Sequence, residues 1–514
     1  MPNRTKSQRG APRKQSRGRA ASSSTPSITA SAQRSQAAQL VHMVASETKA
    51  ELFHSPDRRA FVAVRIGPAS NTWPMRDQAF RRYLEGLFYK KTGRVTTGQA
   101  VEEAIRTLEA NALYDGPEQP VAVRVGHDGG NIYLDLGDGH VVEICPGRWT
   151  VIASSPVRFW RPAGFLVLPI PEVGGHVDEA RPFLDSKAMG EDDFLLQIAW
   201  LLGTLCPWGA YPLLGLSGPQ GSGKSTRARV LRALIDPNTA SLRAAPRSEH
   251  DLVIAAKRGH VIALDNLTYV PPWLSDALCR LLTGGGFATR ELYTNDEETL
   301  IEVKRPVLLT GISVLPVRSD LLDRAILLDV PALADDQRQT EQTFWPAFEA
   351  VRARVLGALL TGAAGVLREL PQTVATGGPR LIDFARFVGA AEEAFGWKAG
   401  TFLAAYERNR HGGHLVALEA TPLVEPLRNL LSHRSMTSVG PWEGTAHDLL
   451  NELSHHTTAA TTRQPAWPKN SRWLAGRLRE LAPNLAAVGI EVTFFQTVGC
   501  GSEKRIRITR QGTP

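Results

Sequence analysis

Apolar and polar positions alternate along the chain in patterns that predict distinct regions. Residues 1–38 contain almost no large apolar side chains and cannot offset the entropy of ordering, so we expect a disordered basic arm. Period-two alternation over Ala60–Val64 and Ile132–Leu136 predicts strands, whereas helical spacing of apolar residues over 78–112 predicts helices. Residues 39–175 are therefore predicted to form a mixed α+β N-terminal domain.

The middle of the chain contains apolar runs that each end in a polar residue. These runs are Leu213–Ser217, His260–Asp265 and Arg305–Thr310, and they are typical of buried strands separated by helices. The pattern predicts an α/β core over residues 176–332. The helical residues that follow, 333–415, are predicted to form a lid over this core.

The last segment, residues 416–514, has its own pattern. A Thr/Ala-rich loop is expected over residues 457–463, followed by a helix over Ser471–Val488. Two strand-like runs, Ile490–Gln496 and Lys504–Thr509, come next. This order of elements resembles a winged helix, and the whole chain is predicted to be an α/β multidomain protein.

The net charge of +8 is located mainly at the N-terminus. Eight of the 59 basic side chains lie within residues 1–34, which contain no acid, so 51 basic side chains remain against 51 acidic ones. A basic arm of this kind can add salt-sensitive affinity for DNA, or it can serve only as a solubilising tail. Elsewhere in the chain, any basic surface has to be local.

Cysteine spacing and hydropathy indicate the compartment. Four cysteines lie far apart without a CxxC pair, which argues against a zinc site or a disulfide framework and fits the reducing cytoplasm. Residues 194–223 carry no charge, but Pro207 and Pro212 divide them, and their second half leads into a glycine-rich loop. We interpret this stretch as a core helix and a core strand, and we expect no membrane partner.

A phosphate-binding pattern follows the first buried strand. Leu213–Ser217 leads into the sequence GPQGSGKS, which has every fixed position of the Walker A motif. Glycines let main-chain N–H groups approach phosphate oxygens, and a helix beginning at the lysine adds its positive end. Lys224 is expected to reach the β- and γ-phosphates of ATP, and Ser225 to bind Mg²⁺. The expected nucleotide-binding residues are Gly218, Pro219, Gln220, Gly221, Ser222, Gly223, Lys224, Ser225 and Thr226.

Asp265 ends the second buried strand and is the predicted Walker B aspartate. It would hold Mg²⁺ together with Ser225, because a Walker A loop requires a second metal-positioning acid on a neighbouring strand. Asn266 follows where many ATPases have a glutamate that orients the attacking water. An amide can hold a water but cannot accept its proton, so hydrolysis is expected to be slow or to use another carboxylate. The alternative is a core strand that ends at a turn-forming Asp-Asn pair.

A hairpin is predicted after the Walker B strand. Phe287–Tyr293 and Thr299–Val303 flank a polar tip, which suits two antiparallel strands. Arg290 and Tyr293 are candidates to contact a DNA strand, one by charge and the other by stacking. The alternative is a purely structural hairpin with a solvated arginine.

Two more residues are candidates for the chemistry of the γ-phosphate. Thr310 ends the third buried strand, the usual position of a residue that senses the γ-phosphate. Arg324 follows Asp320 and Asp323 and opens the next element. An arginine there can cross a subunit boundary and stabilise charge on the transferring phosphoryl group, or it can form a surface salt bridge with these acids.

The order of these parts resembles the AAA+ ATPases of the superfamily 3 helicase group. More narrowly, it is similar to the helicase-like ATP-binding proteins of phages, plasmids and integrated elements in actinobacteria. The stretches that carry the resemblance are Gly218–Ser225, Asp251–Ala256, Asp265–Leu267, Trp273–Arg280, Thr283–Tyr293 and Asp320–Arg324.

The resemblance implies a homo-oligomeric ring, expected to be a hexamer. In such a ring the hairpin with Arg290 and Tyr293 lines a central channel and grips one DNA strand. It also implies that Arg324 acts on the neighbouring subunit's ATP, with Arg318 as the second candidate. Thr310 departs from the pattern, because these proteins usually carry an asparagine there.

The C-terminal segment is locally basic. Residues 463–514 contain nine basic side chains against three acidic ones. In a winged helix these would contact phosphates of duplex DNA, although a merely solvated face is the alternative. The expected contacts are Arg472, Arg477 and Arg479 on the helix, and Lys504, Arg505 and Arg507 on the wing.

These inferences together predict an ATP-dependent DNA helicase or DNA-translocating ATPase that acts in the replication of a mobile element or phage. The catalytic roles are assigned to Lys224, Asp265, Asn266, Thr310 and Arg324. One alternative is a DNA-binding AAA+ ATP switch, a regulator or initiator without unwinding activity, which fits Asn266 and Thr310 better. Another is a DNA-binding protein with a degenerate nucleotide site.

Overall fold

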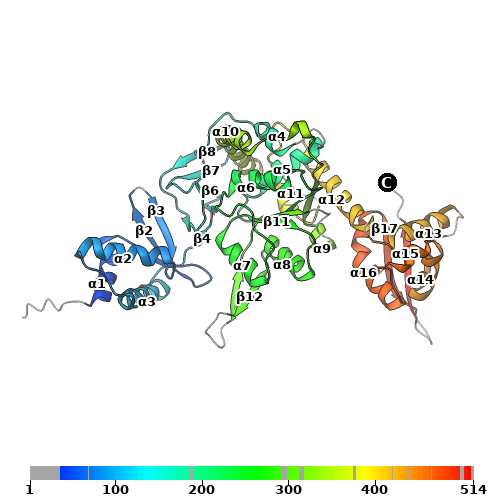
Figure 1. Ribbon diagram of the computed structural model, residues 1–514, viewed down its shortest axis with the longest axis horizontal. Coiled ribbons are helices and arrows are strands. Elements are labelled where there is room, and N and C mark those ends of the chain that lie inside the picture. Colours follow the sequence, from blue (N-terminus) through cyan, green and yellow to red (C-terminus); the bar gives the residue numbers. More distant parts are fainter. Residues whose placement is uncertain are drawn as a thin grey trace, which may run out of the picture.

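The structure is a computed structural model in which three bodies follow one another along the longest axis (Figure 1). It describes residues 35–67, 69–185, 189–290, 298–311, 318–373, 378–419, 421–436, 440–464, 466–497 and 503–510. The predicted α/β multidomain class is confirmed at this level. Most of the predicted basic arm lies outside the described residues.

The N-terminal body pairs a small antiparallel sheet with helices. Its sheet has the order β1-β2-β3, and Phe80, Leu84 and Leu108 lie in its buried core. The first helix begins two residues before the predicted end of the arm, because Ser35 Oγ accepts a hydrogen bond from the Ala38 amide at 3.2 Å. The elements are α1 (Gln36–His42), β1 (Glu51–His54), β2 (Ala60–Ile66), β3 (Ala69–Pro74), α2 (Gln78–Thr92) and α3 (Gly98–Tyr114).

A second antiparallel sheet belongs to the central body by its packing. Its strands are β5 (Val125–Asp128), β6 (Asn131–Asp135), β7 (Val141–Cys145) and β8 (Arg148–Ile152), paired in that order. Ile132, Leu134 and Ile144 share one hydrophobic core with helices of the central body. The range 39–175, predicted as one domain, therefore contributes to two separate cores.

The main sheet of the central body is parallel and has the order β11-β14-β10-β15. Side chains alternate between its faces: Leu214 and Leu216 face one core, whereas Leu213 and Leu309 face the other. Helices cover both faces, as expected for a parallel sheet. The elements are α5 (Glu191–Gly203), β10 (Leu213–Ser217), α6 (Lys224–Ile235), α7 (Glu249–Arg258), β11 (Ile262–Leu267), α8 (Pro272–Thr283), β14 (Val307–Gly311), α9 (Ser319–Leu322) and β15 (Ala325–Asp329).

The predicted hairpin is confirmed as a strand pair that projects from the central body (Figure 1). It consists of β12 (Gly286–Arg290) and β13 (Glu298–Glu302). Phe287 is buried at its base, where it joins the core beneath α8.

A long helix, α10 (Glu341–Glu369), covers the central body together with α11 (Ile382–Gly389) and α12 (Thr401–Glu419). Among the described residues, α10 is the one helix long and apolar enough to cross a membrane, but 72% of its most apolar window is buried inside the protein. It also contains Pro346. These features are those of a core helix.

The C-terminal body combines helices with a three-stranded antiparallel sheet of order β16-β18-β17. Residues 457–463 were predicted as a loop, but α15 forms there because Thr458 Oγ1 accepts a hydrogen bond from the Thr461 amide. The boundary predicted at residue 415 falls inside α12. The elements are α13 (Val424–Met436), β16 (Trp442–Thr445), α14 (Ala446–His455), α15 (Ala459–Arg463), α16 (Ser471–Ala487), β17 (Ile490–Gln496) and β18 (Lys504–Arg510).

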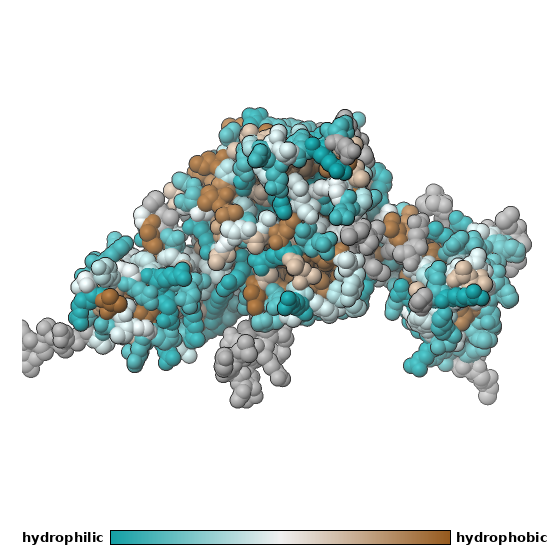
Figure 2. All heavy atoms as spheres, in the orientation of Figure 1, coloured by the Kyte–Doolittle hydropathy of each residue, from teal (hydrophilic) through white to brown (hydrophobic). Residues whose placement is uncertain are grey.

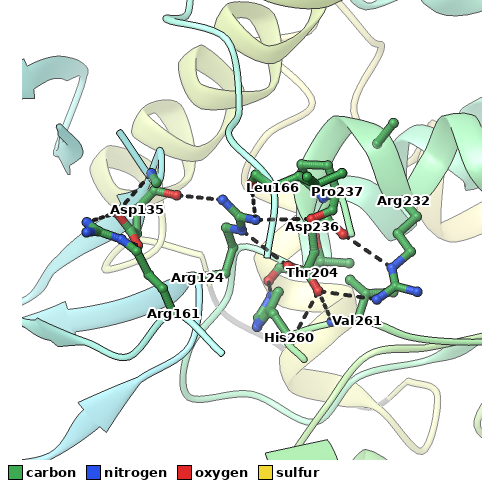
Figure 3. Close-up of polar contacts among 12 residues, drawn as sticks. Arg124, Asp135, Arg161, Leu166, Thr204, Arg232, Asp236, Pro237, His260 and Val261 are labelled. Atoms are coloured by element: carbon green, nitrogen blue, oxygen red, sulfur yellow. Dashed lines mark hydrogen bonds and ion pairs between the residues drawn. The ribbon is translucent and has the colours of Figure 1, made fainter. Parts of the chain in front are cut away.

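A buried charged network joins the β5–β8 sheet to the end of α6 (Figure 3). The Arg124 guanidinium is fully buried and lies 3.4 Å from the centre of the Phe165 ring. It donates to Asp236 Oδ1 at 3.2 Å and to the carbonyls of Asp135 and Leu166 at 3.0 and 2.7 Å. Separating Arg124 from Asp236 would leave an uncompensated buried charge, which costs free energy. The ion pair therefore holds the sheet against α6.

Asp236 is also held from the side of β11. Its Oδ2 atom accepts hydrogen bonds from the amides of His260 and Val261, both at 3.0 Å. The buried His260 ring places Nε2 2.7 Å from the Thr204 carbonyl, so the neutral ring donates there. Burial lowers the pKa of His260 to about 4, against a smaller opposing effect of the Asp236 carboxylate.

This pKa predicts a stability loss in mild acid. The folded state keeps His260 neutral while the unfolded chain takes up a proton near pH 6.5, so stability is complete above that pH and falls as the pH drops towards 4. The full contribution is about 3 kcal/mol. Comparing urea unfolding of wild type and His260→Gln from pH 7 to pH 4.5 should show a shallower decline for the variant. Parallel declines would contradict the burial of a neutral ring.

Candidate functional site

The loop of residues 218–225, called the glycine loop here, connects β10 to α6. A Cβ at Gly218 would lie 2.1 Å from the Val330 carbonyl oxygen, so only glycine fits there. Gly223 has φ +80, the left-handed conformation from which α6 starts at Lys224. The predicted strand–loop–helix context is therefore present.

Lys224 lies folded over this loop. Its Nζ donates to the carbonyls of Gly218 and Pro219, both at 2.8 Å. Burial lowers the pKa of Lys224, and the carboxylates of Asp265 and Asp329 oppose that effect. Ser222 Oγ is buried without a hydrogen-bond partner among the described residues. A phosphate is a stronger partner for the Lys224 ammonium than main-chain carbonyls are. A ligand in the loop would also give the Ser222 hydroxyl the hydrogen bond that it lacks.

Asp265 lies opposite the start of α6, as the sequence predicted. Ser225 Oγ donates to Asp265 Oδ1 at 2.8 Å, and Thr310 Oγ1 donates to the same oxygen. Thr310 Oγ1 in turn accepts from the Asn266 amide at 2.9 Å. The three strand ends and the first turn of α6 thus bring Ser225, Asp265 and Thr310 together.

Asn266 has an unusual backbone. Its φ is +57, and the pairing of β11 with β14 is irregular between Leu264 and Leu267. Asparagine tolerates this left-handed conformation better than most residues, and glutamate tolerates it less well. The main-chain N–H of Asn266 donates to Thr310, while the side chain of Asn266 is exposed.

Asp329 is a residue that the sequence reasoning missed. It ends β15, directly opposite Ser217 at the start of the glycine loop, and it acts on the pKa of Lys224. The signal was present in the sequence, because Ala325–Leu328 is an apolar run followed by an acid, the same pattern that identified Asp265.

A cleft of about 560 Å³ adjoins the glycine loop at Ser222 and Gly223 and extends to Thr226. Aromatic residues from two distant segments form part of its lining, and Phe183 meets Phe344 edge to face with 5.4 Å between ring centres. Sequence reasoning missed this cleft, because its walls come from segments about 160 residues apart. The lining includes Phe183, Asp185, Ser222, Arg227, Leu333, Arg338, Phe344 and Trp345.

The two candidate arginines lie near α8 and α9. Arg324 Nη1 donates to the Asp320 carbonyl at 2.6 Å, and Arg318 Nη1 lies 3.0 Å from the Asp276 carboxylate. Among the described residues, no hydrogen bond or ion pair joins either arginine to the glycine loop. The alternative considered for Arg324, a salt bridge with the Asp320 or Asp323 side chain, is likewise not formed among these residues.

The other predicted DNA contacts differ in how they are engaged. Arg290 ends β12, but its side chain and the whole of Tyr293 lie outside the described residues. Arg477 pairs with Glu480 at 2.8 Å, and Arg479 stacks over the Phe494 ring at 4.3 Å.

The residues predicted to lie on the wing show the same contrast. Arg505 pairs with Glu503 at 3.3 Å and Arg507 with Glu443 at 2.5 Å. Within the described part of the chain, Arg472 and Lys504 have no side-chain hydrogen bond, ion pair or ring contact. These two cations are the most available to an external phosphate.

Family comparisons assign the chain to a class. Residues 186–409 match the family described as actinomycete integrative conjugative element replication protein, and residues 425–514 match the AICE RepA C-terminal domain. The two matches follow each other in order and together cover more than half of the chain. The chain is a replication protein of a mobile element.

Two apo structures of the NrS-1 C-terminal region also align with the chain. One has a TM-score of 0.39 and 12% identity and covers 92% of this chain and 98% of the other. The second has a TM-score of 0.37 and 13% identity, with coverages of 93% and 100%. A search of curated proteins finds no significant match.

The Thr310 hydroxyl should protect the amide of Asn266. Thr310 is 1% exposed, and Thr310→Val removes the acceptor of that amide with little change in shape. We expect hydrogen exchange in the segment around residue 266 to accelerate about tenfold or more, the equivalent of a lost buried hydrogen bond. Thr310→Ser, which keeps the hydroxyl, is the control and should exchange like wild type. Equal exchange in both variants would argue against this contact.

Proposed function

We propose that this replication protein is an ATP-dependent DNA helicase or DNA-translocating ATPase of the AAA+ class. The observation that carries the proposal is the Ser225–Asp265 hydrogen bond of 2.8 Å beside the glycine loop. A hydroxyl and a carboxylate at this distance, next to a lysine on a glycine-rich loop, form the ligand set that P-loop enzymes use for Mg²⁺ and phosphates.

The residues present fit ATP and Mg²⁺. Loop amides and Lys224 would hold the phosphates, and Ser225 and Asp265 would hold the metal ion, which supplies positive charge to the β- and γ-phosphate oxygens. Lys224 would exchange the Gly218 and Pro219 carbonyls for phosphate. The orphaned Ser222 hydroxyl offers a further donor. The adjoining cleft, with its aromatic residues, would accept the nucleoside.

The sheet supports the AAA+ assignment. The parallel order β11-β14-β10-β15 is extended beyond β11 by Arg243, which bridges to Leu264 in parallel. In this interpretation α10–α12 act as the lid, the β12–β13 hairpin faces a DNA strand in a hexameric ring, and Arg324 reaches the neighbouring subunit's site. Arg324 Nε is buried without a partner among the described residues, which is a cost that a subunit contact would remove.

The element order of the C-terminal body supports its interpretation as a winged helix. Strand β16 and helices α14–α16 precede the β17–β18 hairpin, which would serve as the wing. Helix α16 would then contact duplex DNA, and Lys504 lies at the start of the wing's second strand.

A DNA-binding ATP switch is the second candidate. Thr310 commits its hydroxyl proton to Asp265, and Asn266 offers no carboxylate at the position next to it. Both features favour slow hydrolysis. Asp329, near Lys224, is the additional carboxylate that a motor would have available.

Replacing the loop lysine tests the nucleotide site. Lys224→Ala removes the ammonium from the glycine loop and should abolish ATP binding and turnover, whereas the exposed Lys398→Ala serves as a matched control with wild-type behaviour. Binding is measured with a fluorescent ATP analogue, and turnover with and without single-stranded DNA. Unchanged binding in Lys224→Ala would mean a degenerate site. If ATP turnover by wild type is the same with and without DNA, the helicase or translocase proposal is contradicted and the ATP switch is favoured.

Salt dependence tests the C-terminal contacts. Arg472→Ala and Lys504→Ala should each weaken binding to duplex DNA and lower the slope of log K against log salt by about 1. Arg507→Ala should change the slope less, because Glu443 already compensates its charge. Affinities measured by fluorescence anisotropy between 50 and 200 mM salt, a range of about fourfold, decide this. A larger effect at Arg507 would place the contact on the opposite side of the wing.

A further inference from the structure

Helix α16 exposes a tryptophan next to an arginine that forms no ion pair among the described residues. The face formed by Leu474, Leu478 and Leu481 is buried in the core of the C-terminal body. Trp473 lies outside this buried stripe and is 40% exposed. The face drawn in Figure 2 shows the C-terminal body as mostly hydrophilic. An exposed aromatic side chain is not unusual by itself, and the significance of Trp473 comes from the residues that surround it.

Trp473 borders a hollow of about 670 Å³. Gly476 lines this hollow, and a Cβ built at that glycine would meet no atom within 4 Å. Ala466 and Asn470 also line it. These three residues are small or short and leave room for a flat group against the indole ring, whereas the remaining lining residues are charged.

The charges around the hollow are arranged asymmetrically. Arg472 lies beside Trp473, without a hydrogen bond or ion pair in the described part of the chain. At the other end, Arg477 is neutralised by Glu480 at 2.8 Å. An anionic group is therefore favoured next to Arg472 and disfavoured near Glu480, while the space between is suited to an uncharged, flat group.

A nucleotide with an unstacked base has this combination of groups. In an intact duplex the base faces are stacked and only the base edges are accessible in the grooves, where an indole has just one donor to offer. Base faces become available in single strands, at duplex ends and in melted regions. Aromatic stacking is then strong and tolerant of sequence.

We propose that the Trp473 hollow binds an unpaired DNA base by stacking, with the adjoining phosphate on Arg472. This inference rests on the proposed DNA binding of the C-terminal body and extends it. The body binds melted or forked DNA in preference to an uninterrupted duplex, and the ligand class is a nucleotide at a junction between paired and unpaired DNA.

The test uses the full chain without nucleotide and two DNAs of equal length, one fully paired and one with a central unpaired bubble. Dissociation constants are measured at one salt concentration. Trp473→Ala should lose about tenfold or more in affinity for the bubble, the size expected for one stacked base, and little for the paired duplex. Trp473→Phe should retain most of the affinity. Trp273→Ala, at a tryptophan of similar exposure on α8, should bind both DNAs like wild type.

A spectroscopic measurement reports the stacking itself. The fluorescent base 2-aminopurine in the bubble should be quenched when wild type or Trp473→Phe binds, and less so with Trp473→Ala. Equal losses on both DNAs, or no loss on either, would overturn the inference and leave Trp473 as a surface for another protein. If wild type binds neither DNA, both the proposed DNA-binding function and the inference on the Trp473 hollow are wrong.

Discussion

The hydrogen bond between Ser225 and Asp265 exists because three parallel strands end at the same edge of one sheet. Leu216 of β10 lies opposite Thr310 of β14, and β11 pairs with the other side of β14. That register brings a hydroxyl from α6, a carboxylate from β11 and a hydroxyl from β14 to one point. A different strand order would separate them.

Helix α6 connects this point to the rest of the molecule. Its first residue is Lys224, and Asp236, which accepts hydrogen bonds from Arg124, His260 and Val261, follows its last turn. Helix α6 therefore joins the glycine loop at its first turn to the β5–β8 sheet at its last turn. The buried network makes that sheet a part of the central body.

A second connection leads to the C-terminal body. His414 on α12 lies 3.2 Å from the Asp323 carboxylate through Nε2 and 3.2 Å from the Asn484 side chain of α16 through Nδ1. Asp323 is next to Arg324, the residue proposed to reach the neighbouring subunit's site. Helix α16, which would contact DNA, is thus connected through His414 to Asp323, the neighbour of Arg324.

Sequence patterns predicted the parts of the site that follow one another along the chain. The glycine loop, Asp265 and the hairpin strands were found because strand ends and glycine spacing leave local signals. The cleft beside Thr226 was not predicted, since Phe183 and Phe344 meet only in the folded chain. Nor did charge counting reveal that Arg477 and Arg507 have partners, because ion pairs depend on three-dimensional proximity.

The most direct test of this account is an experimental structure of the chain with Mg²⁺ and a non-hydrolysable ATP analogue. The account predicts phosphates within the loop of residues 218–225, a metal ion held by Ser225 and Asp265, and Lys224 released from the carbonyls of Gly218 and Pro219. An analogue bound elsewhere, with Lys224 still on those two carbonyls, would contradict it.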